Sequence, residues 1–178
     1  MKKLLLLIIV GMLIWSCAPK KEADNSAKSN QSEEPVIMPD FTLMDSNGNE
    51  VNLYSILDEG KPVIVDFWAL WCVPCIKLLP HLSSLADEHE NLRVLAISED
   101  SKRQSAKAGK LAVEKGWNVT TLYDPTGEVK KLLGVGVIPE TFYVKPNREI
   151  YFHHFGYEEG EEIEMKEVFE KMIKTLDK

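Results

Sequence analysis

The sequence predicts an α/β protein in which a mixed central sheet is flanked by helices. Three observations support this class. Residues 36–176 alternate between short apolar runs and longer segments with apolar residues at helical spacing. The run at 63–69 is apolar apart from Asp66, as is typical of a strand covered on both faces. After a first hairpin, the order strand-helix-strand-helix-strand-helix-strand-strand-helix implies a mixed sheet with helices on both faces.

The individual elements follow from local signals along the chain. Residues 41–44 and 50–53 flank a turn that contains Asn47-Gly48, so they are expected to form a β-hairpin that caps the sheet. Asn-Gly favours the positive φ angles of tight turns. Apolar periodicity and breaker residues predict the remaining elements: a strand at 63–69, a helix at 73–89 kinked at Pro80, a strand at 92–98, a helix at 101–115, a strand at 119–123, a short helix at 128–133, strands at 140–144 and 149–155, and an amphipathic helix at 161–176.

Composition and charge favour one soluble domain and argue against nucleic acid as a partner. The chain has 178 residues, of which 44% are hydrophobic and 28% charged, as in a globular protein. Its 28 acidic residues outnumber its 21 basic ones, giving a formal net charge of −7. An acidic surface repels phosphate backbones and offers no basic patch for anionic lipid. We expect a monomeric domain over 36–178.

The first 16 residues have the pattern of an export signal. Lys2 and Lys3 precede twelve uncharged residues at 4–15, a run too short to span a bilayer comfortably as a mature helix. Residues 17–35 are polar and cannot bury enough apolar surface to offset chain entropy, so we expect a flexible tether. Removal of residues 1–16 deletes two lysines and no acidic residue, which changes the net charge to −9.

Cys17 follows this apolar run and carries a second signal. Together with the preceding Ile14-Trp15-Ser16, it resembles the lipobox of bacterial lipoproteins. The resemblance implies cleavage before Cys17 and acylation of that residue. The acyl chains would anchor the protein to a membrane of the bacterial cell envelope, with the domain outside the cytoplasm on the periplasmic side. The alternative is a signal peptide cut elsewhere, which would leave Cys17 as a free thiol.

Cys72 and Cys75 stand where the buried strand is followed by a helix, and two residues separate them. This spacing allows a disulfide to close and open without backbone rearrangement, so the pair can carry electrons. The first cysteine lies at the positive end of the helix dipole, near backbone amides that favour a thiolate. We therefore predict that Cys72 is the nucleophile and that Cys75, one turn further in, is the resolving thiol.

A zinc site and a static staple are alternative uses of this pair. A structural zinc ion usually needs four ligands, and the only other cysteine is Cys17, in a different kind of segment. His153 and His154 are adjacent on a predicted strand and face opposite sides, so they do not share a metal simply. A permanent disulfide across so short a loop would stabilise little, because the gain grows with loop length. We therefore expect redox chemistry and no metal.

Four further residues are candidates for the site. Asp66 is a carboxylate in an apolar strand, where desolvation would raise its pKa and suit it to take the proton of the resolving thiol. The alternative is a carboxylate bonded to solvent or backbone. The bond between Ile138 and Pro139 can be cis, which would let the backbone of Ile138 meet a docking peptide; the alternative is a plain turn proline. Trp71, next to the first cysteine, is expected on a docking surface.

Residues 65–75, with Pro80 five residues after the second cysteine, resemble the active site of thioredoxin. The Ile138-Pro139 pair sits where that family carries a cis-proline facing the disulfide. The hairpin, the extra strand-helix unit, the sequence after Pro139 and the export signal resemble the TlpA/ResA/CcmG branch of membrane-tethered thiol-disulfide oxidoreductases. The resemblance covers residues 39–176 and implies a thioredoxin-like fold with an N-terminal β-hairpin and an inserted strand-helix unit.

The same resemblance implies the chemistry and its partners. A redox-active disulfide between Cys72 and Cys75 takes the place of a cofactor, the substrates are proteins that carry disulfides, and a membrane thiol donor supplies electrons. ResA-type proteins have a glutamate three positions after the second cysteine, where this chain has Leu78, so proton handling should follow the thioredoxin pattern through Asp66. The substrate groove is expected to involve Trp71, Val73, Pro74, Ile138, Pro139 and Glu140.

Electron flow is expected to run toward the substrate. Strong oxidants stabilise the thiolate with a side-chain donor between the cysteines, and Val73-Pro74 provides none. We therefore expect a protein-disulfide reductase, in cytochrome c maturation or in general redox homeostasis of the envelope. One alternative is a thiol peroxidase of the same fold, although residues 68–71 lack the threonine and proline that precede a peroxidatic cysteine. Another is a copper-binding module, although the chain lacks the CxxxC spacing of copper chaperones of this fold.

Overall fold

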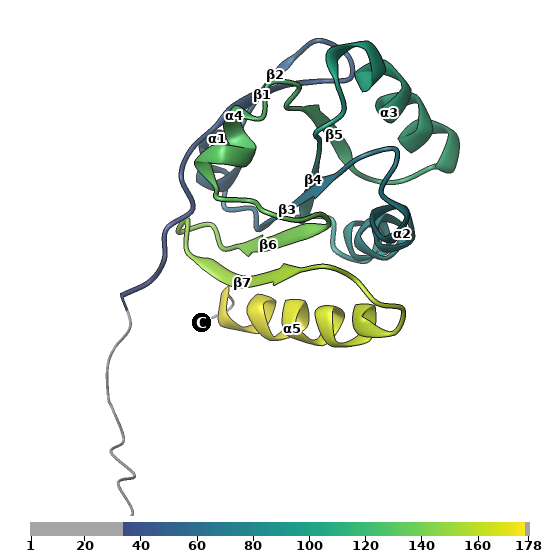
Figure 1. Cartoon of the computed structure of the whole chain (residues 1–178). Coiled ribbons are helices and arrows are strands. Elements are labelled where there is room, and N and C mark those ends of the chain that lie inside the picture. The colour runs from purple at the N-terminus through teal and green to yellow at the C-terminus, as the bar shows by residue number, and fades with distance from the viewer. Residues whose placement is uncertain (1–33, 177–178) are drawn as a thin grey trace, which may run out of the picture. The chain divides into compact units, whose positions relative to one another are not determined.

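The computed structural model describes residues 34–176 (Figure 1). The predicted export signal at 1–16, Cys17 and nearly all of the tether predicted at 17–35 lie outside these residues. Within the described part of the chain, no helix is both long and apolar enough to cross a membrane. The described residues belong to one unit built on a single sheet.

Seven strands form a mixed sheet in the order β2-β1-β5-β4-β3-β6-β7. β3, β4 and β5 are parallel, and the other neighbouring pairs are antiparallel. The predicted α/β class is therefore confirmed. The elements along the chain are β1 (Thr42–Asp45), β2 (Glu50–Asn52), α1 (Leu53–Asp58), β3 (Val63–Trp68), α2 (Val73–Glu88), β4 (Arg93–Ser98), α3 (Lys102–Lys115), β5 (Thr120–Tyr123), α4 (Glu128–Leu132), β6 (Glu140–Val144), β7 (Ile150–Phe155) and α5 (Glu161–Leu176).

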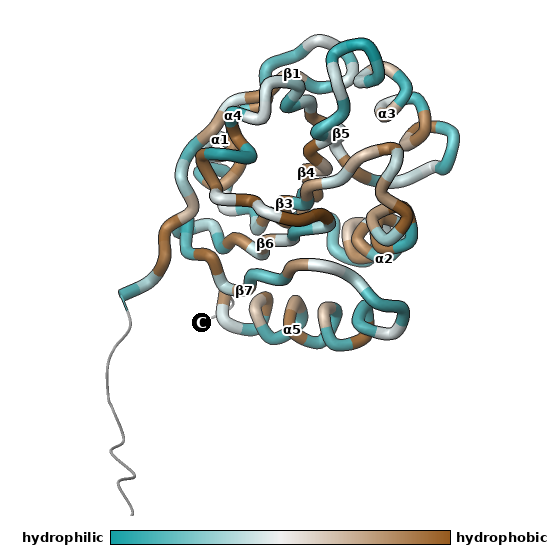
Figure 2. Tube along the Cα trace, viewed as in Figure 1, coloured by the Kyte–Doolittle hydropathy of each residue, from teal (hydrophilic) through white to brown (hydrophobic). Residues whose placement is uncertain are grey.

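Alternation of side chains along β3 divides the core into two sides. Val65 and Phe67 point to the face that α1 and α4 cover, whereas Ile64 and Trp68 point to the face that α2, α3 and α5 cover. Figure 1 shows α1 and α4 grouped together, apart from α2 and α5. Figure 2 shows that β3 is mainly apolar, whereas apolar and polar residues alternate along α5. Asp66 lies between Ile64 and Trp68 in this alternation, so it faces α2.

The segment around residue 53 differs from the prediction. The β1–β2 hairpin extends the sheet by pairing with β5, instead of capping it. Leu53 does not end the second strand but begins α1, because the Asn52 side chain caps the helix by accepting the backbone N–H of Ser55 (2.8 Å). Leu53 and Leu57, one helical turn apart, are then both buried against the sheet. The other predicted elements are confirmed to within one residue at each end.

Candidate active site

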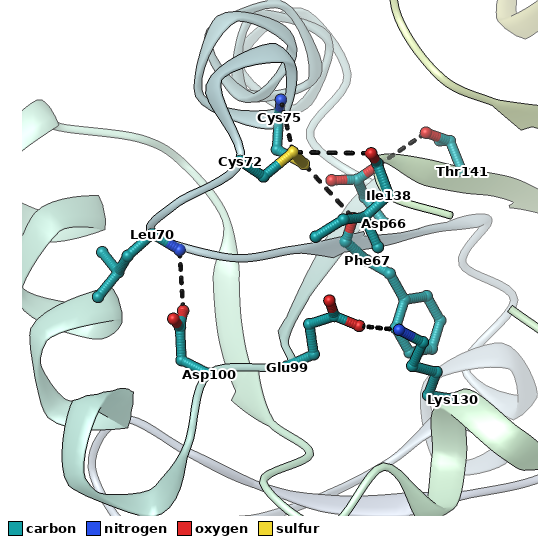
Figure 3. The surroundings of a disulfide bond; sticks show 10 residues. All are labelled: Asp66, Phe67, Leu70, Cys72, Cys75, Glu99, Asp100, Lys130, Ile138 and Thr141. Carbon is teal, nitrogen blue, oxygen red and sulfur yellow. Dashed lines mark hydrogen bonds and ion pairs between the residues drawn. A yellow bond between two sulfur atoms is a disulfide. The ribbon is translucent and has the colours of Figure 1, made fainter. Parts of the chain in front are cut away.

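Cys72 and Cys75 are joined by a disulfide at the start of α2 (Figure 3). Cys72 is the N-cap of the helix, and its Sγ accepts the backbone N–H of Cys75 at 3.2 Å. Cys72 keeps 4% of its surface exposed, whereas Cys75 keeps none. The same N–H and the positive end of the helix would stabilise a Cys72 thiolate in the dithiol form. Of the two cysteines, only Cys72 keeps any exposed surface.

The loop between β3 and the disulfide is held by the end of the neighbouring strand. The Leu70 N–H donates to Asp100 Oδ2 at 2.9 Å, and the Ser98 hydroxyl donates to the same oxygen at 2.9 Å (Figure 3 draws the first bond). Asp100 is buried just after β4. Asp100 was not among the residues that the sequence predicted for the site. A signal for Asp100 in the sequence is the polar run Ser-Glu-Asp, which begins at the last residue of the buried strand β4, at the sheet edge where the parallel strands β3 and β4 both end.

The segment before β6 faces the disulfide. The peptide bond between Ile138 and Pro139 is cis, and the Ile138 carbonyl oxygen lies 3.7 Å from Cys72 Sγ (Figure 3). Pro139 is buried and Ile138 is half-buried. The structure therefore brings the backbone of Ile138 beside the sulfur that is predicted to attack a substrate.

The other predicted groove residues divide into exposed and buried ones. Trp71 and Val73, on either side of the predicted nucleophile, each expose 66% of their surface, and Pro74 is also exposed. Glu140 is only 5% exposed, and its carboxylate accepts the N–H of Gly136 at 3.0 Å. The first three residues can meet a partner directly, whereas Glu140 supports the loop before the cis-proline from inside.

Asp66 is fully buried on β3. Thr141 Oγ1, on the adjacent strand β6, donates to Asp66 Oδ1 at 2.7 Å, and Oδ2 has no hydrogen-bond partner among residues 34–176. Burial raises the pKa of Asp66 to about 7, and the bond from Thr141 opposes the rise. The carbonyl oxygen of the next residue, Phe67, lies 4.0 Å from Cys75 Sγ (Figure 3). The carboxyl group is thus one residue along β3 from a contact of the resolving cysteine and can exchange a proton near neutral pH.

A cluster of possible metal ligands lies at the other end of α2. Ligand atoms of Glu88, His89 and Glu170 come within 4.8 Å of one another. His89 Nε2 lies 3.0 Å from a Glu170 oxygen, and Lys166 Nζ lies 2.6 Å from a Glu88 oxygen, so these carboxylates already have partners. A groove of about 530 Å³ between α2 and α5 borders this cluster. The disulfide belongs to neither feature.

Comparisons with known proteins agree with this geometry. Residues 36–153 match the AhpC/TSA family. The chain is 28% identical over 148 residues to the thiol-disulfide oxidoreductase ResA of Oceanobacillus iheyensis, and the match covers 82% of this chain and 75% of that protein. It is 29% identical over 155 residues to the thiol:disulfide interchange protein DsbE of Escherichia coli K12, covering 86% of this chain and 82% of DsbE.

A solved structure supports the same assignment. The crystal structure of a Chlorobium tepidum protein assigned as a thiol:disulfide interchange protein DsbE is 26% identical and superposes with a TM-score of 0.69. The superposition covers 77% of this chain and 95% of that one. The family match spans more than half of the chain, and the predicted resemblance is confirmed. This chain belongs to the AhpC/TSA family of thioredoxin-like proteins.

Proposed function

We infer that this protein reduces disulfide bonds of other proteins in the bacterial cell envelope. It is a thiol-disulfide oxidoreductase of the ResA/DsbE type. The observation that carries the proposal is the Cys72–Cys75 pair at the start of α2, with the carbonyl of Ile138 3.7 Å from the first sulfur. A substrate backbone that pairs with Ile138 would bring its own disulfide to Cys72.

The proposed reaction uses two thiol-disulfide exchanges. In the reduced protein, the Cys72 thiolate attacks one sulfur of the substrate disulfide; a mixed disulfide forms and the other substrate sulfur leaves as a thiolate. Cys75 then gives its proton to the Asp66 carboxylate and attacks Cys72 Sγ, so the second substrate sulfur leaves and the Cys72–Cys75 disulfide closes. The substrate gains two electrons, and its two thiolates take up protons from water and from the protonated Asp66. Because the cysteine pair itself carries the electrons, no bound cofactor is needed.

The surroundings of the first sulfur favour a reductant. Val73 and Pro74, between the cysteines, supply no side-chain donor, and the hydrogen bond given to Cys72 Sγ comes from the Cys75 amide. A thiolate with so few donors is stabilised less than in a strong oxidant, and the disulfide is correspondingly favoured. A membrane thiol donor would return the pair to the dithiol form. A measured reduction potential near that of DsbA, about −120 mV, would contradict this direction.

The location of the protein is proposed from the sequence. The export signal at 1–16 and Cys17 favour a lipoprotein held on an envelope membrane, with the domain at 36–178 on the periplasmic side. Cys17→Ala should abolish the incorporation of a labelled fatty acid into the exported protein. Labelling of that variant equal to that of the wild type would contradict a lipid anchor at Cys17.

Trapping of substrates tests the proposed function. Cys75→Ser cannot resolve a mixed disulfide, so it should hold natural partners covalently through Cys72, whereas the matched control Cys72→Ser should hold none. The purified dithiol protein should reduce insulin disulfides. Rapid turnover of peroxide that is lost in Cys72→Ser, without insulin reduction, would instead support a thiol peroxidase. Trapping by Cys72→Ser but not by Cys75→Ser would reverse the roles of the two cysteines.

A further inference from the structure

Glu140 closes the loop that carries the cis-proline. Its carboxylate is buried, and its Oε2 accepts the N–H of Gly136 at 3.0 Å. Gly136 lies two residues before Ile138, and Glu140 follows Pro139 directly. The bond therefore spans residues 136–140, and it fixes the segment whose Ile138 carbonyl faces Cys72. We call residues 136–139 the docking segment.

The other oxygen of Glu140 is held by a histidine of strand β7. His153 Nε2 lies 2.8 Å from Glu140 Oε1. The His153 ring stacks on the buried ring of Phe142, with centroids 4.2 Å apart and an angle of 14° between the planes. Stacking restricts the rotation of the imidazole and keeps Nε2 directed at the carboxylate. The residue directly after β7 also holds the docking segment, because the Gly156 N–H donates to the Pro139 carbonyl at 2.8 Å.

Because Glu140 is buried, its carboxylate depends on its two hydrogen-bond partners, Gly136 and His153. A carboxylate oxygen that is buried without a hydrogen-bond donor has lost the free energy of its hydration and gained nothing in return. The side chain would therefore turn toward water if one donor were removed. The His153 side chain is 41% exposed, whereas the Glu140 side chain that it contacts is only 6% exposed. Loss of its imidazole would therefore release Glu140 outward and break the Gly136 bond that shapes the docking segment.

We propose that His153 is a positioning residue for substrate docking, which acts through Glu140 on the backbone of residues 136–139. This inference rests on the proposed reduction of protein disulfides. It assigns to a residue of β7, distant in sequence from the cysteines, the task of keeping the Ile138 carbonyl beside Cys72. His153 touches neither sulfur in the described contacts, so the chemistry of the cysteine pair itself should not depend on it.

Two substrates of different length separate docking from chemistry. One is a peptide disulfide with several residues on both sides of its cysteines, which can pair along the docking segment. The other is oxidised 2-mercaptoethanol, which is too small to do so and needs only Cys72. Second-order rate constants for oxidation of the dithiol protein are measured with both substrates, together with the reduction potential of the pair.

His153→Leu should slow the peptide reaction about five- to tenfold, the loss expected for one ordinary hydrogen bond, and the small-disulfide reaction less than about twofold. The potential should stay unchanged. His153→Gln should recover most of the peptide rate, because the glutamine amide nitrogen can take the place of Nε2. The matched control is His154→Leu: His154 lies on the opposite face, 3.4 Å from Glu161, and its loss should leave both rates unchanged.

Three results would overturn the inference. They are equal slowing with both substrates, a His153→Gln variant as slow as His153→Leu, and an unchanged peptide rate in His153→Leu. If His153→Leu does not fold, Glu140→Gln provides the second test, since it keeps an acceptor for Gly136 but weakens the bond to His153. The same selective loss is expected there, and its absence would count against the inference. A wild-type protein that reduces neither substrate would refute the proposed function and this inference together.

Discussion

Replacement of Asp66 by asparagine should stabilise the oxidised protein at alkaline pH and leave its stability at acid pH almost unchanged. The pKa of Asp66 is about 7 in the folded protein, against 3.8 for an unperturbed group. Because the folded state holds this proton more tightly than the unfolded chain does, the free energy of unfolding falls as pH rises from about 4 to about 7 and levels off above that range. Three pKa units at about 1.4 kcal/mol each amount to about 4 kcal/mol. Asparagine avoids this cost, although its buried amide offsets part of the gain, so we expect about 2 to 4 kcal/mol.

Urea denaturation of the disulfide-bonded protein measures this effect at about pH 5 and about pH 9. Tyr143, which faces the same side of the sheet, does not interfere, because burial and the charge of Asp66 raise the pKa of its hydroxyl well above its usual range. Asp124→Asn is the matched control. The Asp124 carboxylate is buried too, but it accepts the N–H groups of Glu128 (3.0 Å) and Lys130 (2.8 Å). That substitution should destabilise the protein by about 1 to 3 kcal/mol at both pH values.

The stabilisation should come with a loss of activity. An asparagine at position 66 cannot accept the proton of Cys75, so the release of substrate from the mixed disulfide should slow at neutral pH. A gain in stability that is equal at acid and alkaline pH would refute the explanation by charge burial. So would a variant that is less stable than the wild type at every pH.

Three further substitutions test neighbouring parts of the structure. Thr141→Val removes the bond that opposes the pKa rise of Asp66, so the pH at which the stability of the protein levels off should move upward in the same denaturation series. Leu78→Glu puts a carboxylate at a fully buried position and should lower the free energy of unfolding by about 3 kcal/mol or more near pH 8. The loss should be smaller near pH 5, where the acid is neutral. An equal loss at both pH values would contradict charge as the cause. Gly109→Ala drives a methyl group into the Tyr123 hydroxyl and should cost about 1 to 3 kcal/mol, part of which Tyr123→Phe in the same chain should restore in a double-mutant cycle.

The sequence was sufficient to predict the elements whose signals are local. The apolar run at 63–69 indicates a strand buried on both faces, because only such a strand tolerates apolar residues at successive positions. The same run makes Asp66 conspicuous, and the structure buries it completely. The CxxC spacing predicts a disulfide at a helix start, which the structure contains. These features depend on neighbours within a few residues and not on how distant segments pair.

Helix α1 was not predicted, and its first residue, Leu53, was wrongly assigned to the preceding strand, although a local signal for a helix was present. Asn52 is a favourable N-cap residue, and Leu53 and Leu57 have helical spacing. A six-residue helix offers only one apolar repeat, however, and the preceding strand extends naturally into Leu53. For so short an element, the N-cap residue indicates a helix better than the spacing of apolar residues does.

The partners of the site carboxylates could not be predicted from the sequence. Asp66 and Thr141 meet because β3 and β6 pair in one register, and a shift of one residue would turn Thr141 to the opposite face. His153 contacts Glu140 because β7 pairs with β6 in a register that places His153 opposite Phe142, and the His153 ring stacks on that of Phe142. No signal near either residue specifies that register. A hydrogen bond between strands distant in sequence becomes visible only once the sheet is known.

Strand β6 serves the site on both faces of the sheet. Glu140 and Thr141 are successive residues, so one supports the docking segment on the face of α1 and α4 while the other holds Asp66 on the face of α2. The two carboxylates differ in what surrounds them. Glu140 has contacts at both oxygens, whereas Asp66 has one donor and carries a cost of several kcal/mol at neutral pH. A buried group that destabilises the fold and titrates near neutral pH is suited to move a proton, and a fully bonded one is suited to hold a loop in place.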